Sequence, residues 1–424
     1  MTKGRKTNND PKHELGDIVE RLWPLSSGFE YASEVGLSLR MLRPSWWNAF
    51  ENEIIAQPLA QVQGMNFMAW VESRDDLPER DRYIKAALLL CAPRVLREVE
   101  AELACRGKNW DEIPESDPLP ELDGQTIHLY APLECKGYPD NKTSWLDEWT
   151  LEALRGAEVI EQASEAAAIE RLWRVHYPDY VRGIFAQAER GGGVLTPETV
   201  VTEKSPAAIC ASVGALCQAA VDGDKSWLSL ALVRPGSHHG EKGRGGGTCL
   251  INNMAVCASE AIENDRGPVA ILDIDAHHGN GSESIFRENG SCLTVSVHQE
   301  EPFFPGTGQS GEMGRGAGAG ANLNLPMNPS SSWRAKVDQG LVAVERFHPK
   351  LILVEFSADA HRADPTSSLQ ARDDDYCHLG RRLALMNTKV VFELGSSLSE
   401  RAWIGAIRSL VIGWEKGIKE RALR

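Results

Sequence analysis

Apolar residues follow two different spacings along this chain. Between Ile18 and about Arg106 they recur mostly at helical spacing, most clearly over Arg80–Cys105, as is typical of amphipathic helices. The stretch Trp110–Gly124, rich in Pro, Asp and Glu, has the composition of a linker. The pattern therefore predicts a helical N-terminal extension over residues 1–122.

From residue 123 onward, short apolar runs rich in β-branched residues alternate with helix-patterned segments. The predicted strands are Gln125–Tyr130, Trp227–Val233, Val269–Leu272, Cys292–Val297, Leu351–Phe356 and Lys389–Glu393. Such runs indicate parallel strands covered on both faces. We therefore predict an α/β fold over residues 123–424, with three α/β/α layers around a mostly parallel sheet. Chemistry in such sheets lies in the loops beyond the carboxyl ends of the strands.

Composition narrows the functional classes. With 424 residues, 42% of them apolar and 25% charged, the chain can fill one large α/β domain and an extension. Its net charge of −15 argues against nucleic acid binding as the main role. Nine scattered cysteines without a C-x-x-C pair suit reduced thiols, and no apolar run is long enough to span a membrane. We expect a cytoplasmic protein with neither a nucleic acid nor a membrane partner.

Two glycine-rich stretches, Gly243–Gly247 and Gly314–Gly320, contain G-x-G spacings. Neither lies between a strand and a helix of a βαβ unit, because the second runs into Asn322–Pro326, which is extended and stopped by proline. No Gly-Lys-Ser/Thr phosphate loop is present either. Both stretches are predicted to be loops passing close to a metal site.

The end of the predicted strand Val269–Leu272 carries candidate metal ligands. Asp273, Asp275 and His277 occupy every second position, and on an extended chain this spacing places them on one side. Two ionised carboxylates so close together repel each other and are costly to desolvate unless a cation compensates. The pattern therefore predicts a bound divalent metal.

Another strand end supplies a third ligand. Asp359 follows the apolar run Leu351–Phe356, so it is placed like the first pair of acids. Asp364, directly before Pro365, is expected to be a turn residue instead. Three protein ligands would leave an open position on the metal, as catalysis requires. The same ligand set also suits iron or cobalt, so the residues alone leave the metal open between these and zinc.

Adjacent histidines, His238 and His239, follow the predicted strand Trp227–Val233 on an irregular loop, where both rings can face one cavity. A neutral imidazole can accept a proton from a metal-activated water and return it to a leaving amine. Each ring then needs a partner on its second nitrogen, and Asp273 and Asn280 are the candidates.

These stretches together resemble the histone deacetylase superfamily, in particular its bacterial acetylpolyamine amidohydrolase and histone deacetylase-like amidohydrolase branch. That resemblance implies the arginase/deacetylase fold from about residue 125 to the end. The matching segments are Val175–Val181, Val233–Gly240, Gly245–Asn253, Asp273–Gly281, Val295–His298, Phe303–Gly308, Asp359–Pro365 and Phe392–Gly395.

The resemblance implies roles for individual residues. Asp275, His277 and Asp359 match the zinc ligands. His238 and His239 match the catalytic histidines, the second being the expected general base and acid, and Asp273 and Asn280 match their partners. An inner potassium site matches Asp273, Asp275, His277, Ser296 and Val297, and Gly247 and Phe304 match positions lining the substrate tunnel.

Three departures set this chain apart from the family pattern. Ser396 stands where the family has a tyrosine that donates a hydrogen bond to the substrate carbonyl, and losing one such donor costs about two to three orders of magnitude in rate. Thr248 replaces an aromatic tunnel wall, and Thr366 replaces an apolar residue after Asp-Pro. The expected substrate channel is therefore wider and more polar than a slot for an acetyl-lysine stem.

Two functions follow from these residues. The first is a zinc-dependent amidohydrolase that cleaves an acyl-amide of a small or acylated amine, with Ser396 or another group in place of the tyrosine. The alternative is a weakly active or inactive zinc-binding family member that binds an acylated ligand or a partner. Arginase-like hydrolysis at two manganese ions is disfavoured by the histidine pair. For residues 1–122 we expect packing, or formation of a homo-oligomer, in preference to substrate binding.

Overall fold

The computed structural model describes residues 119–136, 138, 144–196, 199–364 and 366–424. They fall within one unit, Ser116–Arg424, and the predicted helical extension lies outside the described residues.

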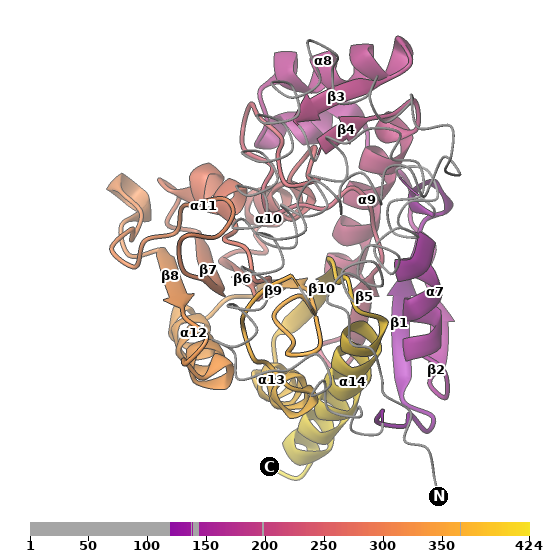
Figure 1. Cartoon of the computed structure of the whole chain (residues 1–424), viewed down its shortest axis with the longest axis vertical. Coiled ribbons are helices and arrows are strands. Elements are labelled where there is room, and N and C mark those ends of the chain that lie inside the picture. Colours follow the sequence, from indigo (N-terminus) through magenta and orange to yellow (C-terminus); the bar gives the residue numbers. More distant parts are fainter. Residues whose placement is uncertain (1–118, 137, 139–143, 197–198, 365) are drawn as a thin grey trace, which may run out of the picture. The chain divides into compact units, whose positions relative to one another are not determined.

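One sheet of eight strands forms the middle of this unit (Figure 1). The strand order is β2-β1-β5-β10-β9-β6-β7-β8, and every neighbouring pair is parallel, as predicted. The carboxyl ends of all eight strands therefore lie at one edge. The strands are β1 (Thr126–Tyr130), β2 (Glu158–Glu161), β5 (Leu228–Ala231), β6 (Val269–Asp273), β7 (Cys292–Gln299), β8 (Asn322–Met327), β9 (Leu351–Phe356) and β10 (Lys389–Leu394).

Helices cover both faces of the sheet. Successive residues of β6 alternate between two hydrophobic cores, because side chains along a strand point to opposite faces. Ala270 and Leu272 belong to the core that includes residues of α7, α12, α13 and α14, whereas Val269 and Ile271 belong to the core that includes residues of α8, α9 and α10. The helices are α7 (Ser144–Ala153), α8 (Pro178–Glu189), α9 (Ser205–Val221), α10 (Asn253–Glu263), α11 (Asn280–Phe286), α12 (Trp333–Phe347), α13 (Asp373–Leu385) and α14 (Glu400–Ala422). This confirms the predicted three-layer α/β/α fold.

Shorter elements complete the chain. The 3-10 helices are η4 (Leu133–Cys135), η5 (Ile169–Arg174) and η6 (Gly316–Gly318), and a separate antiparallel hairpin joins β3 (Gly193–Thr196) to β4 (Thr199–Val201). The predicted stop at Pro326 is wrong, because β8 continues through it to Met327. Proline is tolerated there because β8 is an edge strand that pairs only with β7.

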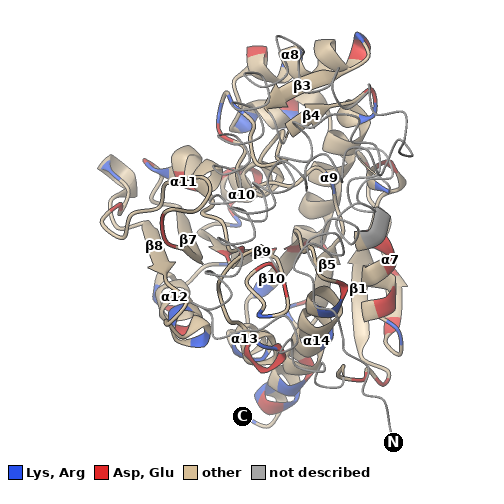
Figure 2. Cartoon of the chain, in the orientation of Figure 1, with Lys and Arg blue, Asp and Glu red and all other residues tan. Residues whose placement is uncertain are grey.

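Charge is concentrated on the surface helices. Figure 2 shows acidic residues along α7 and both acidic and basic residues along α13 and α14, whereas the strands β6, β7 and β8 carry few. Within the described residues, no helix combines the length and apolar character needed to cross a bilayer.

Candidate active site

The end of β6 and the end of β9 deliver the predicted metal ligands to one point. Nδ1 of His277 lies 2.7 Å from Oδ1 of Asp275 and 3.1 Å from Oδ2 of Asp359. One potential ligand atom from each residue lies within 4.8 Å of the others. β6 ends at Asp273, so Asp275 and His277 lie on the loop beyond it and not on an extended strand as we expected. β6 and β9 are adjacent in the sheet, and this adjacency brings Asp359 to the other two.

The charges of this cluster fit a bound cation. Burial and the neighbouring Asp275 raise the pKa of Asp359 to about 8. Burial opposes a charge on His277, but the two carboxylates outweigh it and raise its pKa to about 9. Oδ2 of Asp359 is buried and accepts no hydrogen bond of good geometry, despite its approach to His277. Two carboxylates and an imidazole around an unsatisfied oxygen are a donor set suited to zinc or a similar divalent ion.

Two neighbouring segments hold the acids in place. Oγ of Ser357 donates to Oδ2 of Asp275 at 2.5 Å, and the backbone N–H of Ala276 donates to Oδ1 of Asp359 at 2.9 Å. Each carboxylate therefore keeps one oxygen for a protein donor and directs the other toward His277. Ser357 was not among the predicted site residues, although its place directly after β9 could have suggested it.

The two adjacent histidines have different partners and opposite charge preferences. His238 Nδ1 lies 2.9 Å from Asp273 Oδ2, and His239 Nδ1 lies 2.7 Å from Asn280 Oδ1. Burial disfavours charge on both rings. The carboxylates of Asp273 and Asp275 nevertheless raise the pKa of His238 well above its ordinary value. Burial, with His238 and His277 nearby, holds the pKa of His239 well below it.

Small and aromatic residues form the surroundings of His239. The ring of Phe304 meets it edge-on, with centroids 4.9 Å apart, and Phe303 stacks on His277 at 4.6 Å. A Cβ on Gly247 would clash with the His239 ring, and its φ of +53° suits glycine. The first glycine-rich loop thus passes the site as predicted. The second does not, because Gly314 and Gly318 lie against the segment after α11.

The remaining predicted residues lie at different depths. Thr248 is exposed, whereas Thr366 is buried, and its N–H donates to Asp364 Oδ1. That bond to Thr366 agrees with the predicted turn, and Asp364 also accepts from Ser397 and the backbone of Leu398, which ties the turn to the loop after β10. Ser396 is exposed, and its backbone is bonded to Ser357 and Ala358, next to the Asp-His-Asp cluster.

At the predicted potassium site, Ser296 is the register partner of Asp273 between β6 and β7. Val297 follows within β7 and is fully buried.

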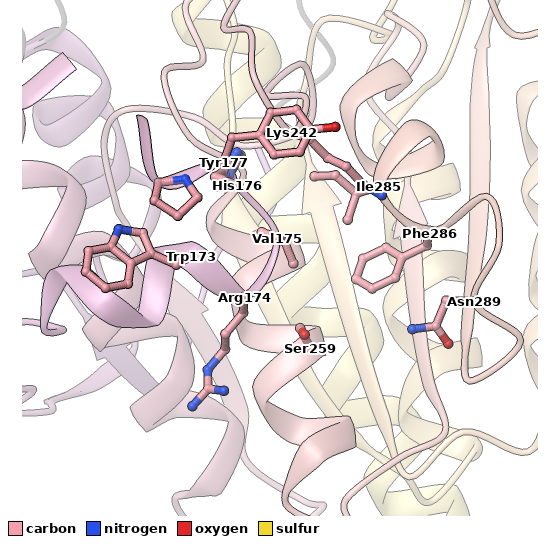
Figure 3. A pocket seen from close by; sticks show the side chains of 11 residues that line it. Trp173, Arg174, Val175, His176, Tyr177, Lys242, Ser259, Ile285, Phe286 and Asn289 are labelled. Atoms are coloured by element: carbon pink, nitrogen blue, oxygen red, sulfur yellow. The ribbon is translucent and has the colours of Figure 1, made fainter. Parts of the chain in front are cut away.

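Four of the five tyrosine hydroxyls in the described part of the chain have hydrogen-bond partners. These four bond to groups other than the three metal-ligand candidates, namely Tyr130 to Asp222, Tyr138 to Ser205, Tyr180 to the carbonyl oxygen of Leu250 and Tyr376 to the carbonyl oxygen of Ser357, which itself adjoins the cluster. The fifth, Tyr177, is exposed and lines a pocket of about 300 Å³ with His176 and Lys242 (Figure 3). None of the predicted site residues lines that pocket.

Residues 142–396 match the family model of the histone deacetylase domain, which is more than half of the chain. The chain belongs to the histone deacetylase family. A probable deacetylase of Archaeoglobus fulgidus is 32% identical over 228 residues, covering 53% of this family member and 63% of the relative. An acetylpolyamine amidohydrolase of Burkholderia pseudomallei is 34% identical over 223 residues, covering 51% and 64%. This histone deacetylase family member thus spans less than two thirds of the length of either relative.

Solved structures agree on the fold. The acetylpolyamine aminohydrolase from Burkholderia pseudomallei superposes with a TM-score of 0.61 at 24% identity, covering 69% of this chain and 99% of that one. The HDA15 HD domain gives a TM-score of 0.59 at 24% identity, covering 68% and 87%. At this identity the likeness shows the arginase/deacetylase fold alone.

Proposed function

We propose that this protein is a zinc-dependent amidohydrolase that cleaves the C–N bond of an acylated small amine. The observation that carries the proposal is the pairing of the Asp-His-Asp cluster, whose two carboxylates are buried, with two histidines of opposite charge preference. The names of the relatives, deacetylase and acetylpolyamine amidohydrolase, support an acyl-amide as substrate.

Asp275, His277 and Asp359 would hold the zinc ion, which when bound supplies a Lewis acid for the substrate carbonyl and for water. The lowered pKa of His239 favours its neutral form, and the ring lies beside His277, with centroids 6.0 Å apart. It accepts a proton from the attacking water and returns it to the departing amine nitrogen. His238, held charged by Asp273, stabilises negative charge that develops on the substrate oxygen.

The substrate would enter past Gly247, Thr248 and Phe304. Thr366 is buried and bonded to Asp364, so it would support the entrance without being exposed in it. Ser396 takes the place of the tyrosine of other family members in this proposal. Its short side chain leaves room for a wider acyl group or for a bridging water. A potassium ion held by Asp273, Asp275, His277, Ser296 and Val297 would support the loop from within.

A second candidate function is that of a weakly active or inactive member that binds an acylated ligand or partner. The exposure of Ser396 and the hydrogen bonds of four of the five described tyrosine hydroxyls favour it. The two functions predict different results with the same compounds, since the first releases an amine readily and the second releases little or none.

The test measures amine release from a panel of N-acylated diamines by the zinc-loaded full chain. We expect turnover that falls about a thousand-fold or more in His239→Gln, since general base catalysis contributes about 10²–10⁴. The matched control is His378→Gln, which should keep full activity. His378 lies on α13 and pairs with Asp338 of α12. Saturable binding of the same compounds without amine release would support the alternative, and equal activity of His239→Gln would refute the assigned base.

A further inference from the structure

Glu241, two residues after His239, is joined to it through Asn280. The Asn280 side chain accepts from His239 Nδ1 through Oδ1 at 2.7 Å and donates from Nδ2 to Glu241 Oε1 at 3.0 Å. The same Glu241 oxygen accepts from Arg244 Nη2 at 2.6 Å. Nδ1 of His239 is thus connected to the Glu241 carboxylate through two successive hydrogen bonds.

The Glu241 carboxylate determines which atom donates and which accepts in the hydrogen bonds from Glu241 to His239. An ionised carboxylate can only accept hydrogen bonds, so the amide nitrogen of Asn280 must face Glu241 and the amide oxygen must face His239. His239 Nδ1 must then carry the proton. In the neutral ring, which the lowered pKa of His239 favours, Nε2 then keeps its lone pair and can act as a base.

We propose that Glu241 is a positioning residue that sets the tautomer of His239 by fixing the orientation of the Asn280 amide. The inference rests on the proposed role of His239 as the base. Without the carboxylate, the amide can turn over and present its NH₂ group to Nδ1. The ring proton then moves to Nε2, and the nitrogen needed for proton transfer is blocked.

The backbone around Glu241 holds its side chain in this position. Its N–H donates to the carbonyl oxygen of Arg244 at 2.8 Å, and its own carbonyl oxygen accepts from Nδ1 of His176 at 2.9 Å. The Glu241 side chain is 28% exposed, whereas that of Arg244 is 72% exposed. An ion pair with so exposed a partner contributes little by itself, so the effect of Glu241 should act through Asn280.

The experiment compares Glu241→Met, Asn280→Asp and the double variant in the full chain, by ¹⁵N NMR of the His239 ring and by steady-state kinetics. The His239 signals are assigned from their loss in His239→Gln. We expect Glu241→Met to raise the Nε2–H fraction and to lower kcat about ten-fold or more with KM nearly unchanged. Glu288→Gln is the control, since it removes an exposed carboxylate that pairs with Arg315.

The double variant separates tautomer control from a merely structural role. An aspartate at position 280 can only accept, so adding Asn280→Asp to Glu241→Met should restore Nδ1–H and recover kcat. In the presence of Glu241 the same Asn280→Asp change places two carboxylates together and should be harmful. A Glu241→Met protein with an unchanged tautomer, or a double variant no better than Glu241→Met, would overturn the proposal. The NMR readout decides the question even if the protein hydrolyses no amide, so this failure is distinct from failure of the proposed function.

Discussion

At the scale of single residues, the two adjacent histidines are distinguished by their partners. His238 faces a carboxylate and favours the charged form, whereas His239 faces an amide and favours the neutral form. Their rings are only 3.9 Å apart, so a charge on one discourages a charge on the other. This division suits one ring to electrostatic stabilisation and the other to proton transfer.

Gly247 should be essential to the position of His239. In Gly247→Ala the new methyl group meets the imidazole ring, and the backbone conformation is unfavourable for alanine. We expect kcat to fall about a hundred-fold because the base is displaced, with zinc content unchanged. The neighbouring Gly246→Ala, whose methyl group would meet no atom within 4 Å, should retain activity. Equal losses in both variants would contradict the assigned contact.

Ser396 offers a gain-of-function test. Ser396→Tyr adds a phenol hydroxyl beside the cluster and should raise kcat about ten-fold or more, since an oriented donor contributes about 10²–10³ at best. Ser396→Phe adds the same bulk without the hydroxyl and should give no gain. Equal kcat in the two variants would show that a hydrogen bond from a tyrosine hydroxyl at position 396 does not speed the reaction.

At the scale of elements, apolar runs predicted the central strands, because these strands are buried on both faces. The edge strand β2 was missed, since its four residues, Glu158–Glu161, are all exposed and only two are apolar. Asn280 was predicted as the partner of His239, but the contacts that continue from Asn280 to Glu241 were not. They depend on the start of α11 packing against the histidine loop, where Gly281 N–H donates to the carbonyl oxygen of His238.

His176 joins three elements and should make the fold sensitive to acid. It lies before α8, its Nδ1 donates to Glu241 O, and its Nε2 accepts from the backbone N–H of Asn252, the N-cap of α10. Burial lowers its pKa to about 4 from an ordinary 6.5. The unfolded chain therefore binds a proton more readily than the folded chain between these values, and stability falls as the pH drops below 6.5.

The expected contribution of His176 is a loss of about 1 kcal/mol in the free energy of unfolding between pH 7.5 and 5.5. Urea unfolding at the two pH values measures it. His176→Gln should be less stable overall but should show a smaller loss on acidification than the parent protein. An identical pH dependence in the two proteins would exclude His176 as the cause.

At the scale of the whole molecule, the parallel topology explains why the metal-ligand candidates could be predicted from the sequence and why their neighbours in the sheet could not. Residues at the carboxyl ends of strands meet at one edge whatever the strand order, so Asp275, His277 and Asp359 could be grouped from sequence alone. The strand order could not, because β9 enters the sheet between β6 and β10 by long-range packing. Consequently the buried pair Glu355 and Glu393, register partners on β9 and β10, was not anticipated.

Because the cluster joins β6 to β9 in the centre of the sheet, metal binding should stabilise the whole unit. Zinc at about a thousand times its Kd should add about 4 kcal/mol to the free energy of unfolding of chelator-treated protein and raise Tm. Asp359→Asn should abolish that rise. The metal-free variant should nevertheless be at least as stable as the metal-free parent, because burial and Asp275 disfavour the charge on Asp359 and an amide oxygen can still accept from Ala276. Asp338→Asn on α12, paired with His378 and Arg382, should keep the full response to zinc. A zinc-dependent rise of equal size in Asp359→Asn would mean that the stabilising metal binds elsewhere.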